Sequence, residues 1–294
     1  MEQKKKLAKP AVSVLMPFYD NGTEANRGVF SEAVSAMLSQ TFTDFEIVLV
    51  ASGKKEFARK LAAKSRKIRL FFFEQKVNPA KSLPLAEKLY GIITARNMCI
   101  EKARGEFLAF ADYDDVSLPS RLETEVKFLK AHPKIGAVGS STIMIDREGN
   151  EIGRRSALET DGKIRAHMLQ FNPVPQPTLM ARAALVRKAG CYRQGEIPED
   201  YDLWVRMAAI SKFHNLQEPL VKYRVHEGGG ASNYKVELYL GSLRVKMRAA
   251  KTLGLKISPK DLFVNFCQFI SLFFPNFLRR IALERIRGKV VIGE

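Results

Sequence analysis

The 294-residue chain has too few cysteines for a disulfide framework or a cysteine-rich zinc site. Its three cysteines, Cys99, Cys191 and Cys267, are far apart, and none belongs to a CxxC pair. We therefore expect neither zinc nor disulfides, as in a protein of a reducing compartment. The sequence also lacks an apolar run of the roughly 18 residues that a membrane-spanning helix needs, so it predicts no such helix.

Acidic residues are scarce relative to basic ones: 31 Asp and Glu stand against 48 Lys and Arg, a formal net charge of +17. This balance favours anionic partners such as phosphates, nucleic acid or an anionic membrane. Much of the excess lies in Lys4–Lys6 and in residues 231–294, which hold 12 basic and 4 acidic residues. Because no nucleic-acid-binding motif accompanies the charge, we expect no nucleic-acid partner.

The first half of the chain alternates between strand-like and helix-like segments. The strand-like segments are residues 12–16, 45–50, 68–73 and 107–111, and the helix-like ones are residues 30–40, 54–65 and 84–103. This alternation predicts an α/β fold with a Rossmann-like, mostly parallel sheet flanked by helices. No G-x-G-x-x-G follows the first strand, which argues against a dinucleotide-dependent oxidoreductase. Ligands of parallel sheets bind at the carboxyl ends of the strands.

Three carboxylates follow the strand predicted at 107–111, in the stretch "FADYDDVSLP". Asp112 and Asp114 are two residues apart and can point to the same side of an extended segment. Mg²⁺ and Mn²⁺ take oxygen ligands and often use only one or two protein carboxylates. A DxD pattern alone is common by chance, and Asp115 or Ser117 could instead cap a helix predicted to begin near Pro119. Both interpretations stay open at this point.

Two further motifs carry candidate chemistry. In "PEDYDLW", Glu199, Asp200 and Asp202 open a predicted helix, either as favourable partners of its dipole or with one of them as a general base. In "YRVHEGGGAS", His226 is a candidate metal ligand or phosphate contact, or else an ordinary surface histidine. The glycines after it permit a mobile lid.

The last segment, residues 231–294, differs in character from the rest. In "LFVNFCQFISLFFPNF", Asn265, Gln268 and Ser271 recur every three positions and form one polar stripe on an otherwise apolar helix. A strongly basic segment, "LRRIALERIRGK", follows. Aromatic residues beside basic ones favour an interfacial helix on an anionic membrane surface, through residues 260–290. The alternative is a helix that packs on the domain core or in a homodimer interface.

The order of these blocks resembles that of the family 2 glycosyltransferases with the GT-A fold. The resemblance rests on "VSVLMPFYDNG", "FSEAVSAMLSQTFTDFEIVLV", "TARNMCIEKARGEFLAFADYDD" with "LPSRL", "PEDYDLW" and "YRVH", and it covers about residues 11–232. It implies a glycosyltransferase domain over residues 10–230, with a nucleotide-sugar half at about 10–118 and an acceptor half at about 119–230. Residues 231–294 would be a C-terminal helical extension.

The resemblance implies an inverting transfer of a sugar from a nucleotide diphosphate sugar, assisted by Mn²⁺ or Mg²⁺. Asp200 matches the catalytic base and Glu199 its partner. The implied metal site consists of Asp114, Asp112 and His226. The residues implied for binding the donor nucleotide sugar are Pro17, Phe18, Tyr19, Ser52, Arg96, Asn97, Asp112 and Asp114.

Two positions depart from the family pattern. Ala51 and Ser52 stand where an acidic pair usually follows the second strand, so the carboxylate that would accept from a uracil N–H is absent and Ser52 would bond more weakly. Gln176 stands where many members have His, in the acceptor half. Alternatives to an active transferase are a catalytically silent nucleotide-sugar-binding protein and a nucleotidyltransferase-like enzyme, although "MPFYDNG" lacks the Gly- and Arg-containing loop of the latter.

The resemblance and the basic tail together suggest where the enzyme works. We expect a saccharide or lipid-linked acceptor, a role in cell-surface polysaccharide biosynthesis, and a cytoplasmic protein held peripherally at the inner face of the cell membrane.

Overall fold

A computed structural model of the chain describes residues 9–74, 85–225, 234–275 and 290–291. Its strands join one sheet in the order β10-β7-β6-β8-β4-β1-β2-β3, and β9 pairs with β6 and β5. The strands are β1 Val12–Asp20, β2 Phe45–Gly53, β3 Ile68–Phe72, β4 Phe107–Phe110, β5 Val116–Ser117, β6 Ile135–Ile145, β7 Glu151–Arg155, β8 Met180–Arg182, β9 Lys212–Arg224 and β10 Val290–Val291.

The N-terminal half of the sheet is parallel, as predicted. Strand β1 pairs in parallel with β2 and β4, and β2 pairs in parallel with β3. Strand β8 runs antiparallel to both β4 and β6, so the second half is mixed. Strands β1 and β2 are longer than predicted because their pairing continues to Asp20 and Gly53. The carboxyl ends of β1, β2 and β4 therefore lie along one edge of the sheet.

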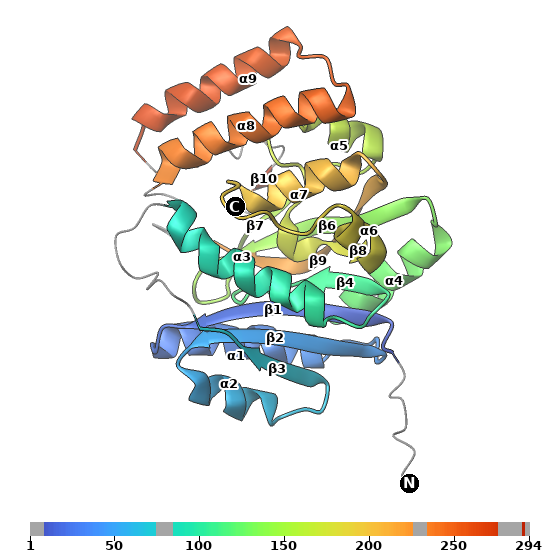
Figure 1. Cartoon of the computed structure of the whole chain (residues 1–294), viewed down its shortest axis with the longest axis vertical. Helices are drawn as coiled ribbons and strands as arrows, with labels where there is room; N and C mark the ends of the chain where they lie inside the picture. The colour runs from blue at the N-terminus through green and yellow to red at the C-terminus, as the bar shows by residue number, and fades with distance from the viewer. Residues whose placement is uncertain (1–8, 75–84, 226–233, 276–289, 292–294) are drawn as a thin grey trace.

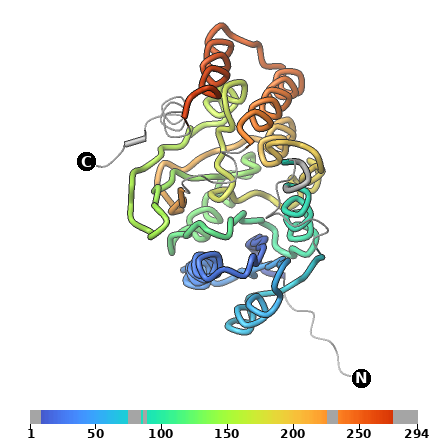
Figure 2. Tube along the Cα trace, turned by 90° about the vertical axis from the view of Figure 1, so that its left-hand side faces the viewer, coloured from blue at the N-terminus to red at the C-terminus, as the bar shows by residue number. Residues whose placement is uncertain are grey.

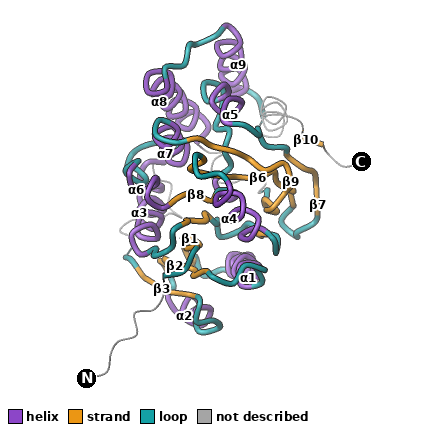
Figure 3. Tube along the Cα trace, turned by 90° about the vertical axis from the view of Figure 1, so that its right-hand side faces the viewer, coloured by secondary structure: helices purple, strands orange, loops and turns teal. Residues whose placement is uncertain are grey.

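Helices cover both faces of this sheet (Figure 3). They are α1 Glu24–Leu38, α2 Lys55–Ala62, α3 Leu85–Lys102, α4 Arg121–Ala131, α5 Asp161–His167, α6 Ala183–Lys188, α7 Glu199–Ala208, α8 Lys235–Leu253 and α9 Pro259–Ile270, with short 3₁₀ turns η1 Gln176–Thr178 and η3 Ser271–Phe273. Alternate strand residues supply two apolar cores: Val14 and Met16 pack with α1, α2 and α4, whereas Leu15 packs with α3, α6 and α7. This alternation follows from the two-residue period of a strand.

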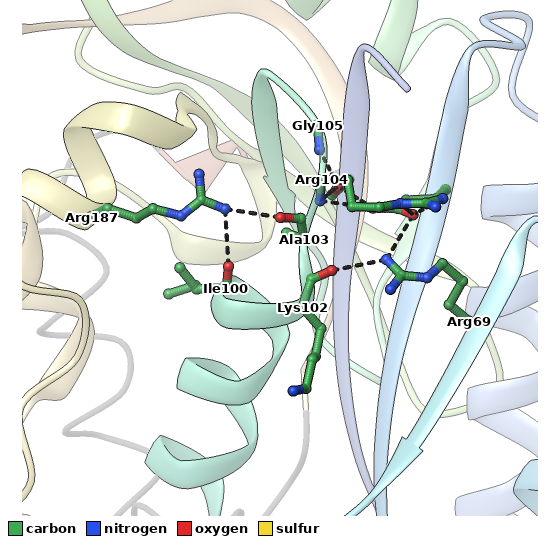
Figure 4. Close-up of polar contacts among 9 residues, drawn as sticks. Arg69, Ile100, Lys102, Ala103, Arg104, Gly105 and Arg187 are labelled. Carbon is green, nitrogen blue, oxygen red and sulfur yellow. Dashed lines mark hydrogen bonds and ion pairs between the residues drawn. The ribbon is translucent and has the colours of Figure 1, made fainter. Parts of the chain in front are cut away.

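The C-terminal end of α3 is fixed by arginines from two other elements (Figure 4). Arg187 donates to the carbonyls of Ile100 (3.2 Å) and Ala103 (2.9 Å), and Arg69 donates to that of Lys102 (2.8 Å). Cations at this end satisfy carbonyls that have no partner within the helix and suit the negative end of its dipole. The bonds tie α3 to β3 and α6, and so hold the site residues that α3 carries.

Helices α8 and α9 form a hairpin at the end of the molecule opposite α2 and β3 (Figures 1 and 2). Val245 and Ala249 of α8 are buried in the same core as Trp204 of α7. Gly241 permits this approach, because a Cβ there would lie 2.1 Å from the carbonyl oxygen of Ile197. Over the described residues, every helix is either too short or too polar to cross a membrane.

Candidate functional site

A small cavity opens where β1 and β4 end. Ala111 donates its backbone N–H to the carbonyl of Leu15 (3.1 Å), which brings Asp112 beside Pro17 at the carboxyl ends of the two strands. Side chains from α3, from η1 and from the segment before α7 complete the wall. The lining residues are Leu15, Pro17, Arg96, Phe110, Ala111, Asp112, Gln176 and Tyr192.

Arg96 of α3 joins two carboxylates in this cavity. Its Nη2 donates to Asp112 Oδ1 at 3.1 Å, and its Nη1 donates to Glu199 Oε1. Only about a tenth of the side chains of Arg96 and Glu199 is exposed: 10% and 11%. Burial alone would lower the pKa of Arg96, but the two carboxylates outweigh it and raise that pKa. The guanidinium is thus held charged between the DxD carboxylate and the first turn of α7.

Asp112 accepts a second hydrogen bond besides that from Arg96. Its Oδ1 also accepts from Gln176 Nε2 at 3.1 Å, and Gln176 Oε1 accepts from the hydroxyl of Tyr192 at 2.7 Å. Burial raises the pKa of Asp112 and the charge of Asp114 raises it further, while Arg96 opposes both. Gln176, which belongs to the predicted acceptor half of the sequence, thus contacts Asp112, which belongs to the predicted nucleotide-sugar half.

Asp200, at the start of α7, is held through both carboxylate oxygens. Asn172 Nδ2 donates to its Oδ2 at 2.9 Å, and the backbone N–H of Tyr201 donates to its Oδ1 at 2.7 Å. Burial, with a further contribution from the charge of Glu199, raises the pKa of Asp200 to about 7. A carboxylate with a pKa near neutrality is suited to accept a proton.

The third acid of this turn, Asp202, has a structural role. It is fully buried and pairs with Arg206 (2.8 Å) and Arg248. Arg248 comes from α8, so Asp202 ties α7 to α8. Sequence alone left open whether each of these three acids was merely a dipole partner; the contacts separate Asp202 from Glu199 and Asp200.

The other donor-side candidates lie around this edge with different side-chain directions. Tyr19 is half-buried near the end of β1, and it pairs in register with buried Ser52 of β2. Phe18 points to the opposite face, where it stacks on Phe30 with ring centroids 3.9 Å apart. Asn97 exchanges hydrogen bonds with the backbone of Tyr192 (2.8 and 2.9 Å), so its amide positions that residue.

The remaining acidic residues of the cluster hold strand β9. The backbone N–H of Arg224 donates to Asp115 Oδ1 at 2.8 Å, and Arg224 Nε donates to the carbonyl of Asp114 at 3.0 Å. The alternative that Asp115 or Ser117 caps the next helix is wrong. The N-cap of α4 is Ser120, and the hydroxyl of Ser117 instead accepts from Arg121 at 2.9 Å.

The donor set here fits a divalent cation. Among the described residues, no three His, Cys, Asp or Glu side chains gather at one point. Two carboxylates, Asp112 and Asp114, suffice for Mg²⁺ or Mn²⁺ when a substrate phosphate supplies further oxygens. Burial is the main cause of the raised pKa of Asp112, and the charge of Asp114 adds to it, so the two carboxylates are close enough to interact. His226, predicted as a third ligand, lies outside the described residues.

Asn172 and Tyr192 were not found by sequence reasoning. Asn172 sits in the Pro-rich stretch "FNPVPQPTLM", where an Asn before Pro resembles an ordinary loop residue. Its contact with Asp200 spans 28 positions, and the contact of Tyr192 with Gln176 spans 16. No local pattern signals contacts of this kind.

The sequence is similar to those of known glycosyltransferases. The family model described as "Glycosyl transferase family 2" matches residues 13–189, more than half of the chain. The amylovoran biosynthesis glycosyltransferase AmsE of Erwinia amylovora is 28% identical over 242 residues, which cover 80% of this chain and 86% of AmsE.

Two solved structures share the fold. S. aureus TarS in complex with UDP-GlcNAc has a TM-score of 0.60 at 18% identity, over 90% of this chain and 72% of TarS. The mannosyltransferase PcManGT from Pyrobaculum calidifontis, in complex with GDP-Man and Mn²⁺, has a TM-score of 0.53 at 15% identity, over 96% of this chain and 86% of PcManGT. The expectation of a GT-A fold is therefore confirmed.

Proposed function

Because the chain belongs to glycosyl transferase family 2, we propose that it moves a sugar from a nucleotide diphosphate sugar to a hydroxyl group, with inversion at the anomeric carbon. The observation that carries this proposal is the setting of Asp200. Its two oxygens are oriented by Asn172 and by the backbone of Tyr201, and its pKa is raised to about 7. These are the properties of a positioned general base.

The proposed reaction is a single displacement. Asp200 takes the proton of the acceptor hydroxyl as its oxygen attacks the anomeric carbon. The bond from that carbon to the diphosphate oxygen breaks on the opposite face, and the nucleoside diphosphate leaves. One displacement inverts the configuration. The leaving group needs no proton, so a second carboxylic acid of the glycosidase type is not required.

We propose that the residues near Asp200 bind the donor and the metal ion and hold the carboxylates in position. We assign Asp112 to the donor ribose and, with Asp114, to the divalent cation. When bound, Mn²⁺ or Mg²⁺ would supply positive charge to the departing diphosphate. Arg96 holds Asp112 and Glu199 in fixed positions by bridging them. The negative charge of Glu199 in turn contributes to the raised pKa of Asp200. The pKa of the proposed base therefore lies near 7.

We propose that this protein recognises the nucleobase differently from most members of the family. The end of β2 offers the methyl group of Ala51 and the hydroxyl of Ser52, both buried, in place of a carboxylate. An acid at this place would accept from the uracil N–H, and neither residue replaces its charge. We propose that Pro17 and Tyr19 flank the nucleotide, and that base preference is weak or not for uracil. A thermal-shift panel of nucleoside diphosphates, with and without Mn²⁺, tests this directly.

The acceptor is proposed to be a saccharide or lipid-linked saccharide of a cell-surface polysaccharide. This rests on the similarity to AmsE, whose name places it in amylovoran biosynthesis. We propose that the enzyme is cytoplasmic and peripheral at the inner face of the membrane. The basic residues of the tail support an anionic surface as partner.

Replacement of Asp200 by Asn tests the proposal. Asp200→Asn should lower the transfer rate by about 10²–10⁴-fold, while binding of the nucleotide sugar, measured by calorimetry with Mn²⁺, is retained. Asp202→Asn, two residues away, is the matched control. It breaks a buried pairing and should lower the melting temperature, with a smaller effect on turnover of the folded protein. Unchanged transfer in Asp200→Asn would refute the base assignment and favour a silent binder or another base.

A further inference from the structure

Helix α9 packs on the protein through its polar side. Asn265 Nδ2 donates to the carbonyl of Leu169 (2.9 Å), and Gln268 Nε2 donates to that of Gln170 (2.8 Å). The side-chain oxygens of both residues accept from Lys246 Nζ of α8 at 2.7 Å. The polar stripe predicted from the sequence therefore faces the rest of the protein, and Asn265 and Gln268 form hydrogen bonds with it.

The opposite side of α9 and the end of η3 expose large apolar side chains. Phe263 is 65% exposed, Phe266 59% and Phe273 75%. With their neighbours at helical spacing they form what we call the phenylalanine face: Leu262, Phe263, Phe266, Phe269, Ile270 and Phe273. This is the reverse of an ordinary surface helix, whose apolar side faces the core. A contiguous exposed apolar surface of this kind marks a site of interaction.

The exposed charges of the hairpin that carries the phenylalanine face are mostly basic. Over residues 234–275, the exposed basic residues are Arg244, Lys251, Lys256 and Lys260, and the exposed acidic residue is Glu237. Asp261, on α9 itself, is buried in the capping box with Ser258. The whole chain carries +17. An anionic partner is therefore favoured over a neutral one.

We propose that the phenylalanine face inserts into the headgroup region of an anionic phospholipid bilayer, with α9 lying parallel to the membrane surface. An interfacial helix buries its apolar side at the boundary of headgroups and acyl chains, and basic residues beside it contact anionic lipids. The hairpin lies at one end of the molecule, so α9 can reach a flat surface (Figure 1). This sharpens the peripheral location in the proposed function and assigns it to one helix face.

A second copy of the chain fits this face less well. A two-fold interface through the phenylalanine face would bring the same patch of both copies together. Lys256 and Lys260, at the start of α9, would then bring positive charge to both sides of the interface, and Glu237 is the exposed acidic residue among residues 234–275. Like charges opposed in this way disfavour the dimer and favour anionic lipid.

The test compares two double variants of the full chain by cosedimentation with vesicles of equimolar phosphatidylglycerol and phosphatidylcholine. Phe263→Ser with Phe266→Ser removes apolar area from the face without a change of charge. Ile152→Ser with Ile210→Ser removes two exposed apolar side chains from elsewhere and is the matched control. The first variant should bind vesicles at least about tenfold more weakly than the wild type, and the second should bind like the wild type.

A second pair of substitutions tests the charge. Lys256→Gln with Lys260→Gln should weaken binding by about fivefold per lysine, and pure phosphatidylcholine vesicles should bind poorly in every case. Donor binding by the Phe263/Phe266 variant should equal that of the wild type, which separates this proposal from the catalytic one. Vesicle binding that survives loss of both phenylalanines would overturn the assignment. So would concentration-dependent dimerisation that the variant abolishes without any effect on lipid.

Discussion

The strand-end site and the α9 hairpin depart from ordinary protein surfaces in opposite ways. At the site, charged residues are buried: Arg96, Glu199 and Asp202, each taken as a whole residue, are at most 9% exposed. On α9, phenylalanines are exposed and amides face inward. Both arrangements are costly, because charges lose hydration in the first and apolar area meets water in the second.

The difference shows how each region can be recognised as functional. Buried charges persist only when partners hold them, so the site is a network in which one loss affects several groups. Exposed apolar groups need no internal partner, so their loss should leave the fold unaffected. Each prediction below tests one side of this contrast, from the largest expected effect to the smallest.

Replacement of Arg96 by Met should have the largest effect. It leaves the buried Glu199 and the partly buried Asp112 without their cation, and breaking a buried ion pair costs about 3–5 kcal/mol. Urea unfolding should report this loss of stability, and transfer should fall to background. Lys60→Met is the control, since Lys60 and Glu56 form an exposed pair at 2.8 Å, whose loss should not be measurable. A stable, active Arg96→Met protein would show that the buried charges of the site do not depend on one another, and would contradict the contrast with α9.

Replacement of Asp114 by Asn should abolish the dependence of donor binding on Mn²⁺. One carboxylate would remain, and the affinity for the nucleotide sugar should fall to that of wild-type protein treated with EDTA. Calorimetry with and without the metal measures this. Glu218→Gln, on exposed β9 surface, should behave as the wild type. Equal stimulation by Mn²⁺ in Asp114→Asn and wild type would remove Asp114 from the metal site.

Replacement of Asn172 by Ala should have a smaller and more specific effect. The Asn172 N–H stabilises the ionised form of Asp200, so its loss raises the pKa of Asp200 further. We expect kcat at neutral pH to fall by about tenfold, with recovery at higher pH and little change in KM for the donor. Asn150→Ala, in the exposed β6–β7 turn, is the control. A uniform loss of rate at every pH would indicate a merely structural role.

The sequence predicted the elements that carry the site better than it predicted the site's internal contacts. Alternating strands and helices, and the placement of Asp112 and Asp200 at element ends, follow from local patterns. The bridge by Arg96 does not, because it joins residues 103 positions apart. The same holds for Gln176, whose bond to Asp112 spans 64 positions. Such contacts are set by the tertiary packing of α3, η1 and α7.

The tail illustrates a second limit. The spacing of Asn265, Gln268 and Ser271 predicted one polar stripe, but not the direction in which it faces. An apolar side usually turns toward the core. Here carbonyls of Leu169 and Gln170, together with Lys246, offer hydrogen-bond partners that an apolar side could not satisfy. Only the positions of those distant groups decide the orientation.

The pH dependence of kcat/KM tests most directly whether Asp200 is the general base, since this quantity reports the pKa values of the free enzyme. Asp200 acts in its ionised form, and its pKa is raised to about 7. The rate should therefore be low at pH 5, rise through a midpoint near pH 7 and level off above it. A carboxylate base with an ordinary pKa would already be ionised at pH 5. A profile that is flat from pH 5 to 9 in the wild type would contradict the account.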